Sequence, residues 1–195
     1  MKKLLYYLVF GLWYGASLLP LRVLYWLSDG LFFIMFHVLH YRRRTVWVNI
    51  VTSFPEREPE DHKRIERDFY RWFCDYVVES VKLMTMKPEE MRRRMVFRNP
   101  EVVDGCIAEG QSCAVFLGHL CNWEWITSLP FWVTDRAQCG QLYHPLENKD
   151  FDRLFLHVRQ RFGAVCISMN ESLRKILEYK RQEAKIGRAS CRERV

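Results

Sequence analysis

The chain has 195 residues, with 30 Lys and Arg against 23 Asp and Glu, so its formal net charge is +7 and its pI is about 9.1. Hydrophobic residues make up 49% of the chain, aromatic residues 15% and charged residues 27%. This composition excludes a disordered chain, a collagen-like repeat and a small secreted protein held together by disulfides.

The C-terminal segment, residues 185–195 (KIGRASCRERV), resembles the translation of a short-read sequencing adapter more than a protein segment. We therefore predict that it is an artefact, and that the natural reading frame continues beyond about residue 184. The alternative is a genuine basic C-terminal tail.

The N-terminal segment is apolar and rich in aromatic residues. Leu4–Leu21 contains no ionised side chain, and in Val23–Tyr41 Asp29 is the one residue that is certainly charged. Crossing a bilayer takes about 20 apolar residues in a helix, so each half is marginal. Pro20 lacks a backbone donor and predicts a break between the halves. We expect residues 1–44 to form a membrane anchor, either one helix or a helical hairpin.

Basic residues flank this segment on both sides, with Lys2 and Lys3 before it and Arg42–Arg44 after it. Because basic residues prefer the cytoplasmic side of a membrane, this pattern favours zero or two crossings, although one stays possible. A buried helical hairpin in a soluble protein is the alternative, and a cleaved signal peptide fits less well.

From Thr52 the sequence has the character of a soluble protein. Residues 61–86 are expected to form an amphipathic helix that covers a core with the apolar residues at helical spacing, which are Ile65, Phe69, Trp72, Phe73, Tyr76, Val77 and Val81. A short charged helix is expected to start at Pro88.

After Pro100 short apolar runs alternate with charged amphipathic segments. Strands are expected at Cys113–Leu117, Gln138–Tyr143 and Ala164–Ser168, and helices at Asn148–Phe162 and Glu171–Arg181. This order predicts parallel strands joined by crossovers, and hence an α/β domain over residues 45–184. The six cysteines before the tail form no Cys-x-x-Cys pair, so we expect reduced thiols, no metal site and no cofactor.

The candidate catalytic residues are His119 and Glu124, five positions apart directly after the first strand. Ligands of α/β sheets bind at the carboxyl ends of strands. A carboxylate at this spacing can orient the imidazole and leave its other nitrogen as a general base. Asn122, from the same segment, is a candidate substrate-binding residue. A purely structural histidine is the simpler alternative.

A second polar segment follows the next strand, and we expect it to lie beside the first at the same sheet edge. Its candidate substrate-binding residues are Tyr143, His144, Asn148, Lys149 and Arg153. The two cations could bind phosphate, and Asn148 could donate to a carbonyl or an oxyanion. The alternative is a turn followed by a solvated helix start.

Several blocks of the chain, in this order, resemble the bacterial lipid A secondary acyltransferases, the lauroyl and myristoyl transferases. The blocks are the apolar anchor, Arg43-Arg44 through Val48-Asn49-Ile50 to Ser53-Phe54-Pro55-Glu56, Gly118-His119 to Glu124, and Tyr143-His144-Pro145 to Asn148. The resemblance covers essentially all of residues 1–184.

The resemblance implies a membrane helix or hairpin followed by a glycerolipid-acyltransferase-like α/β domain that is incomplete at its C-terminus. It implies an O-acyltransferase of the bacterial inner membrane, acting on the cytoplasmic face. The enzyme would move an acyl chain from acyl carrier protein, or from a CoA thioester, to a hydroxyl of a lipid A precursor. His119 would deprotonate that hydroxyl and Glu124 would orient His119. No nucleic-acid partner is expected.

The chain departs from the family pattern at two places. Many relatives have Arg where this chain has His144, which puts the role of that position in doubt. Relatives also continue with further blocks after the region of Glu171, so the chain as given could bind membrane without turning over. The alternative functions are an acyltransferase whose acceptor is another membrane glycolipid or an aminolipid, and a non-catalytic membrane-bound interaction protein.

Overall fold

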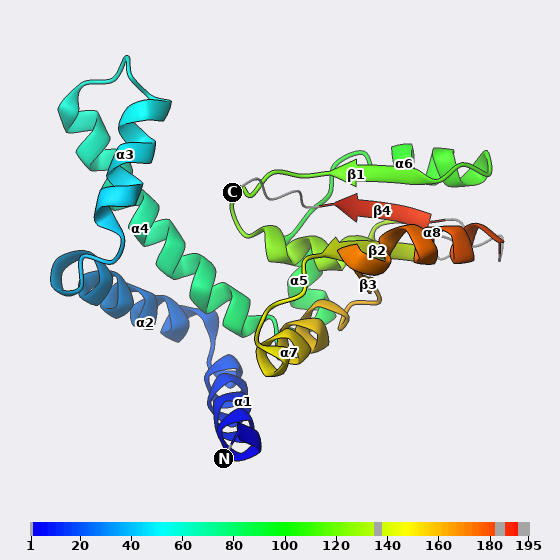
Figure 1. Ribbon diagram of the computed structural model, residues 1–195, viewed down its shortest axis with the longest axis horizontal. Coiled ribbons are helices and arrows are strands. Elements are labelled where there is room, and N and C mark those ends of the chain that lie inside the picture. The colour runs from blue at the N-terminus through cyan, green and yellow to red at the C-terminus, as the bar shows by residue number, and fades with distance from the viewer. Residues whose placement is uncertain (1, 135–137, 182–185, 191–195) are drawn as a thin grey trace. The chain divides into compact units, whose positions relative to one another are not determined.

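The computed structural model describes residues 2–134, 138–181 and 186–190, with side chains at 5–134 and 138–181. The chain forms two compact units, whose elements are labelled in Figure 1. The helical unit is Leu12–Thr85, and the sheet unit is Met1–Gly11 together with Met86–Val195. Residues 191–195, the end of the adapter-like segment, lie outside the described residues.

The helical unit contains the end of α1 (Lys2–Leu18), α2 (Leu21–Phe33), the π-helical segment η1 (Ile34–Val38), α3 (Arg43–Ser53) and α4 (Pro59–Lys82). The predicted break at Pro20 is confirmed, because α1 ends at Leu18 and α2 begins at Leu21. Pro20 has φ −58° and ψ 145°, and it has no N–H to donate back into α1.

One candidate membrane span lies in the described residues, at Leu21–Val38, with a mean hydropathy of 1.3. The other apolar helix, Leu5–Leu18, is shorter. Length and composition make Leu21–Val38 a candidate, but buried core helices and signal sequences meet the same criterion. Its large side chains are largely exposed, Trp26 by 73% and Phe33 by 59%. This exposure is unlike that of a core helix.

Side chains at the end of α4 and just after it satisfy carbonyl groups at the end of α1 and just beyond it. Lys82 Nζ donates to the carbonyl oxygens of Ser17 at 3.0 Å and Leu19 at 2.9 Å, and Thr85 Oγ1 also donates to Ser17. The last four carbonyls of a helix have no partner within it. The buried Lys82 therefore compensates for the break at Pro20 and ties the chain there to α4.

The predicted amphipathic helix is present as α4, but the expectation of which face packs was wrong. The buried positions include a stripe at four-residue spacing, His62, Glu66, Tyr70, Cys74 and Val78, and near the end of the helix Ser80 and Lys82. The apolar residues assigned to the core, from Ile65 to Val81, are only half-buried. Polar contacts decide the orientation, because His62 donates to the Phe54 carbonyl and Glu66 accepts from Arg43.

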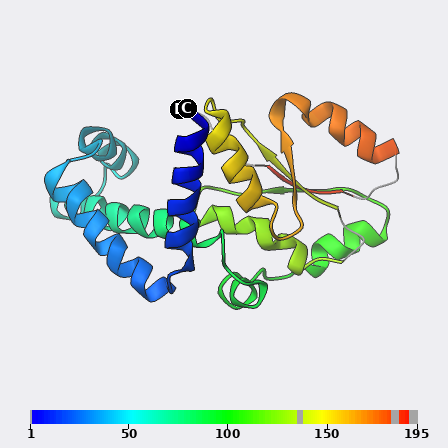
Figure 2. The ribbon, with the colours of Figure 1, turned by 90° about the horizontal axis from the view of Figure 1, so that it is seen from below.

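The sheet unit alternates helices and strands, as the sequence predicts. Its elements after α1 are α5 (Pro88–Arg94), α6 (Glu101–Ala108), β1 (Cys113–Phe116), η2 (Trp123–Phe131), β2 (Gln138–Tyr143), α7 (Lys149–Arg159), β3 (Val165–Ser168), η3 (Met169–Glu171), α8 (Ser172–Arg181) and β4 (Ile186–Ser190). Figure 2 shows α7 and α8 on one side of the sheet and α6 and η2 on the other. The expected strands and the helix from Pro88 are confirmed.

The strands form one parallel sheet in the order β1-β4-β2-β3. The prediction of parallel strands is therefore confirmed. Leu129, Val133 and Cys139 form a buried cluster with Phe97 and Val103 against it. On α7, Leu154 and Val158 are buried.

β4 changes one expectation about the site. Gly187 pairs with both Cys113 of β1 and Cys139 of β2, so β4 separates these two strands. The segments that follow β1 and β2 therefore share a sheet edge but do not lie on adjacent strands, contrary to the expectation. β4 comes from the segment that resembles an adapter. Its interpretation as an artefact stays a prediction, which sequencing the gene across this junction tests.

Candidate functional site

His119 lies just beyond the carboxyl end of β1, where the chain turns toward η2. Its side chain is exposed, and its ring meets that of Trp123 edge to face, with centroids 4.8 Å apart. Cys121 has a left-handed backbone (φ 50°), which reverses the chain between His119 and η2. The imidazole is thus open to solvent at the strand end, the position where α/β sheets bind ligands.

Glu124 is buried at the start of η2 and is paired with Arg159 from the last turn of α7. Arg159 Nε donates to Oε2 at 2.7 Å and Nη2 donates to Oε1 at 2.6 Å. The side chains are 5% exposed for Glu124 and 20% for Arg159. Two-pronged pairing of this kind fixes the plane of the carboxylate as well as its position.

The structure does not join the two candidate catalytic residues. Among the described residues, no hydrogen bond connects His119 to Glu124, and both carboxylate oxygens of Glu124 accept from Arg159. The link between them is indirect, since Trp123 contacts the His119 ring and is the neighbour of Glu124 in η2.

Tyr143 and Cys166 share the surroundings of this ion pair. Burial raises the pKa of the Cys166 thiol from 9.0 to about 11, with Arg159 lowering it and Glu124 raising it. Burial also raises the pKa of Tyr143 above its ordinary value of 10.0; Asp152 adds to this and Arg159 opposes it. The ends of β2 and β3 therefore meet the Glu124–Arg159 pair within the sheet unit.

The remaining candidates differ in their environment. Asn122 is buried, whereas His144 is exposed with Nδ1 3.0 Å from the Pro145 carbonyl oxygen. Asn148 caps α7, because its Oδ1 accepts from the backbone N–H groups of Asp150 at 3.0 Å and Phe151 at 3.3 Å. Only its Nδ2 group is then left to donate to a ligand.

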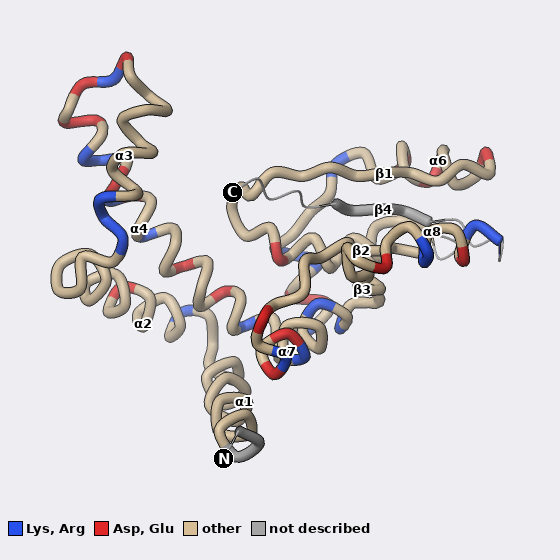
Figure 3. The backbone as a smooth tube through the Cα atoms, viewed as in Figure 1, with Lys and Arg blue, Asp and Glu red and all other residues tan. Residues whose placement is uncertain are grey.

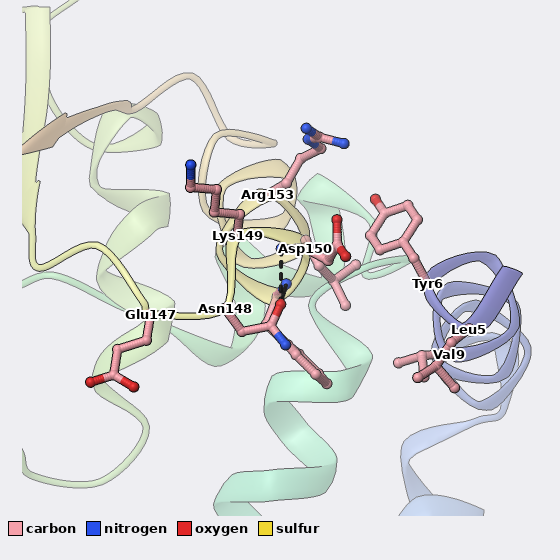
Figure 4. A pocket seen from close by; sticks show the side chains of 10 residues that line it. Leu5, Tyr6, Val9, Glu147, Asn148, Lys149, Asp150 and Arg153 are labelled. Atoms are coloured by element: carbon pink, nitrogen blue, oxygen red, sulfur yellow. Dashed lines mark hydrogen bonds between the residues drawn. The ribbon is translucent and has the colours of Figure 1, made fainter. Parts of the chain in front are cut away.

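A cavity of about 720 Å³ lies between the start of α7 and α1, and Figure 4 shows the side chains around it. Lys149, Asp150 and Arg153 supply polar groups from α7, and Leu5, Tyr6 and Val9 supply a wall from α1. His119, Asn122, Tyr143 and His144 are not among its lining residues. The structure therefore divides the predicted site into a strand-end part and a cavity part.

Within the described residues, no group of three or more His, Cys, Asp or Glu side chains is placed so that it could hold a metal ion. The six cysteines whose side chains are described are free thiols.

Sequence reasoning missed Arg159 and the wall from α1. The signal for Arg159 was Glu124 itself, a carboxylate between Trp123 and Trp125 in a segment whose burial demands a cationic partner. The candidates were the basic residues of the next helix, and spacing alone does not choose among them. The wall from α1 left no signal, because it brings together residues about 140 positions apart.

Comparisons with known proteins agree with the family that the sequence resembles. The family model described as "Bacterial lipid A biosynthesis acyltransferase" matches residues 1–190. The chain is 20% identical over 142 residues to the lipid A biosynthesis myristoyltransferase of Escherichia coli (strain K12), and equally to lipid A biosynthesis acyltransferase 1 of Shigella flexneri. These alignments cover 72% of this chain and 43% of each relative, so the chain spans less than half of their length. The chain belongs to the bacterial lipid A biosynthesis acyltransferase family.

Proposed function

We propose that the protein containing this chain is an O-acyltransferase that moves a fatty acyl chain from a thioester to a hydroxyl of a lipid A precursor. The donor is acyl carrier protein or CoA. The observation that carries the proposal is the family match over residues 1–190, which includes an exposed histidine at the carboxyl end of a parallel strand.

In the proposed reaction His119 is the general base. Its free imidazole nitrogen takes the proton of the acceptor hydroxyl while that oxygen attacks the thioester carbonyl. The new C–O bond forms, the C–S bond breaks, and the thiolate leaves with the proton that the imidazolium returns. The exposure of His119 supports this role, because both substrates must reach its ring.

We assign Glu124 the orienting role in the substrate complex, with Arg159 holding its carboxylate in place. Hydrogen bonds between catalytic groups are often long in unliganded enzymes and tighten with substrate bound. The buried, two-pronged pair gives Glu124 a fixed position next to Trp123, whose ring meets His119. Asn122, Tyr143 and His144 are the proposed contacts of the reacting group.

Asn148, Lys149 and Arg153 are proposed to bind the acceptor from the cavity. Within the described residues the charged ends of Lys149 and Arg153 have no ion-pair partner, so both are available for phosphate oxygens. Figure 4 shows these two side chains on the same side of α7, across from Tyr6 of α1. The cavity thus combines an apolar wall with two cations that could bind phosphate, although the carboxylates of Glu147 and Asp150 also line it.

We propose that residues 1–44 attach the protein to the bacterial inner membrane, with the sheet unit on the cytoplasmic face. The exposed apolar side chains of Leu21–Val38 support membrane attachment. The basic residues Arg42–Arg44 that follow it support a cytoplasmic position for that end.

The test is lipid A mass spectrometry of cells that lack a secondary acyltransferase, complemented with the gene recovered beyond codon 184. We expect lipid A to gain one acyl chain, with a mass increment that gives its length. His119→Ala should lower transfer by about 10²–10⁴-fold. The matched control is His157→Ala, an exposed histidine of α7 that we place outside the site.

If lipid A is unchanged although the protein is present in the membrane, the acceptor is another glycolipid or an aminolipid. Full transfer by the His119→Ala variant would overturn the assignment of the base. Loss of transfer in both histidine variants would indicate damage to the fold.

A further inference from the structure

A basic hollow of about 500 Å³ lies in the helical unit, and none of its lining residues belongs to the proposed acyl-transfer site. It is formed by the start of α3, the turn before it and the first half of α4. Its lining residues are His40, Arg43, Arg44, Trp47, Lys63 and Glu66.

The charges of the hollow do not balance. Arg43 and Glu66 neutralise each other through two hydrogen bonds of 2.9 and 2.8 Å, and this bond with Glu66 raises the pKa of Arg43 above its ordinary value. Arg44 and Lys63 have no hydrogen-bond or ion-pair partner among the described residues. The hollow therefore presents two unneutralised cations to solvent.

The hollow adjoins the apolar surface of the same unit. The candidate span ends at Val38, and Val38, Leu39 and Tyr41 are exposed by 58%, 64% and 49%. His40 and Arg42 have left-handed backbones (φ 49° and 52°), which turn the chain sharply from the apolar helix into α3. Figure 3 shows this change, with few charges along α2 and a basic run at the start of α3.

Several contacts fix the apolar segment to the basic hollow. The Arg43 guanidinium lies over the Phe36 ring, 4.5 Å from its centroid. Tyr70 of α4 donates its hydroxyl to the Tyr41 carbonyl. Because Arg43 is also held by the buried Glu66, η1, α3 and α4 meet in one well-defined arrangement.

We propose that this hollow binds the phosphate of an anionic phospholipid headgroup at the membrane surface. Arg and Lys are the side chains that bind phosphate oxygens, and anionic headgroups attract basic residues next to a membrane-embedded helix. Trp47, which lines the hollow, fits a position at the membrane surface, since Trp side chains gather at membrane interfaces. The hollow shares no residue with the proposed acyl-transfer site, so this proposal does not rest on acyl transfer.

The experiment is native mass spectrometry of the chain in detergent, titrated with dioleoyl phosphatidylglycerol or with dioleoyl phosphatidylcholine. We expect the anionic lipid to bind the chain at roughly tenfold lower concentration. Arg44→Gln with Lys63→Gln should weaken that binding by roughly 30-fold, since each cation near a membrane surface contributes about 1 kcal/mol.

The matched control is Arg64→Gln with Arg67→Gln, which removes the same charge from exposed positions of α4 outside the hollow. It should weaken binding by less than about threefold. The charge-conserving variant Arg44→Lys with Lys63→Arg should keep the preference for the anionic lipid, and it serves where the glutamine variant does not fold.

Three outcomes would overturn the proposal. Equal binding of both lipids, or equal weakening by both glutamine variants, would mean that no specific site exists. Displacement of the lipid by millimolar inorganic phosphate would make the hollow a site for free phosphate. Capture of an acidic carrier protein by the hollow in place of the lipid would make it a protein-docking surface. Lipid A mass is a separate readout, so each of these results leaves the acyl-transfer proposal intact.

Discussion

Arg159 reaches from the end of α7 to Glu124 at the start of η2 and donates to both of its carboxylate oxygens, at 2.7 and 2.6 Å. The pair connects two elements that lie on opposite sides of the sheet (Figure 2). A buried carboxylate that loses its cation keeps the cost of desolvation without compensation. The pair therefore makes the packing of α7 depend on the residue that follows Trp123, the contact of the proposed catalytic base.

Arg159→Met should lower the free energy of unfolding by about 3 kcal/mol, because it leaves Glu124 buried and unpaired. Glu124→Gln with Arg159→Met should recover part of this loss, since no charge is then left buried. A urea titration of the purified chain in detergent, followed by circular dichroism, measures both.

The control for this pair is Arg174→Met, because Arg174 and Glu171 form an ion pair of 2.7 Å between side chains that are 73% and 51% exposed. An exposed pair contributes about 0–1 kcal/mol. Equal losses in Arg174→Met and Arg159→Met would contradict the importance of burial.

Lys82→Met should lower the free energy of unfolding by about 2 kcal/mol, because the Leu19 carbonyl loses its side-chain donor and the Ser17 carbonyl keeps only that of Thr85. The same urea titration measures the loss. Arg67→Met removes an exposed cation from the same helix and should change stability by less than about 0.5 kcal/mol. An unchanged midpoint for Lys82→Met would show that solvent satisfies these carbonyls.

Thr127→Val should be neutral or stabilise the chain by up to about 1 kcal/mol. The Thr127 side chain is 1% exposed, and its hydroxyl has no hydrogen-bond partner among the described residues. Replacing an unsatisfied buried hydroxyl with a methyl group removes its desolvation cost. The measurement is the thermal unfolding midpoint of Thr127→Val, compared with that of Ser128→Ala at the neighbouring position.

Ser128 is equally buried, but its hydroxyl donates to the Trp125 carbonyl at 2.7 Å. Ser128→Ala should therefore destabilise the chain by about 1 kcal/mol. The reverse order of the two variants would argue against the described hydrogen bonding of η2.

The thiols should differ in reactivity toward iodoacetamide at pH 8. Burial raises the pKa values of Cys74, Cys139 and Cys166 from 9.0 to about 11, which lowers their thiolate fraction by about 100-fold. Cys121 is exposed and should be alkylated first. Peptide mass spectrometry over time gives the order, and early labelling of Cys139 would contradict its burial.

The raised pKa values of these thiols also make the free energy of unfolding depend on pH. The folded chain keeps these protons up to about pH 11, whereas the unfolded chain releases them near pH 9. The unfolded state then binds fewer protons, so stability is fully present below pH 9 and falls as pH rises toward 11. Cys139→Ala should reduce this slope in urea titrations at pH 8, 9, 10 and 11.

Local patterns were sufficient to predict β1, β2 and β3, the starts of α5, α7 and α8 to within one residue, and the break at Pro20, whereas α3, α6 and β4 were not predicted. Each depends on a few neighbouring residues, such as the apolar run from Cys113 that ends before Gly118. Parallel pairing followed from the alternation of strands and helices. These features are decided by local backbone preferences and burial, which the sequence carries directly.

Features that depend on distant partners were not predictable in the same way. The face of α4 that packs is decided by contacts such as those with Arg43 and with the Ser17 carbonyl, which lie 23 and 65 positions from their partners on α4. The partner of Glu124 is 35 positions away. The position of β4 between β1 and β2 rests on backbone hydrogen bonds, which any extended segment can form.

Several contacts that hold the helical unit together end on backbone carbonyls. His62, Tyr70 and Lys82 donate to the carbonyls of Phe54, Tyr41 and Ser17. Every residue type offers such an acceptor, so these contacts constrain the donors on α4 and leave the identity of the acceptor residues open. Substitutions are therefore restricted at these donors on α4 and tolerated at the residues whose backbone carbonyls accept from them.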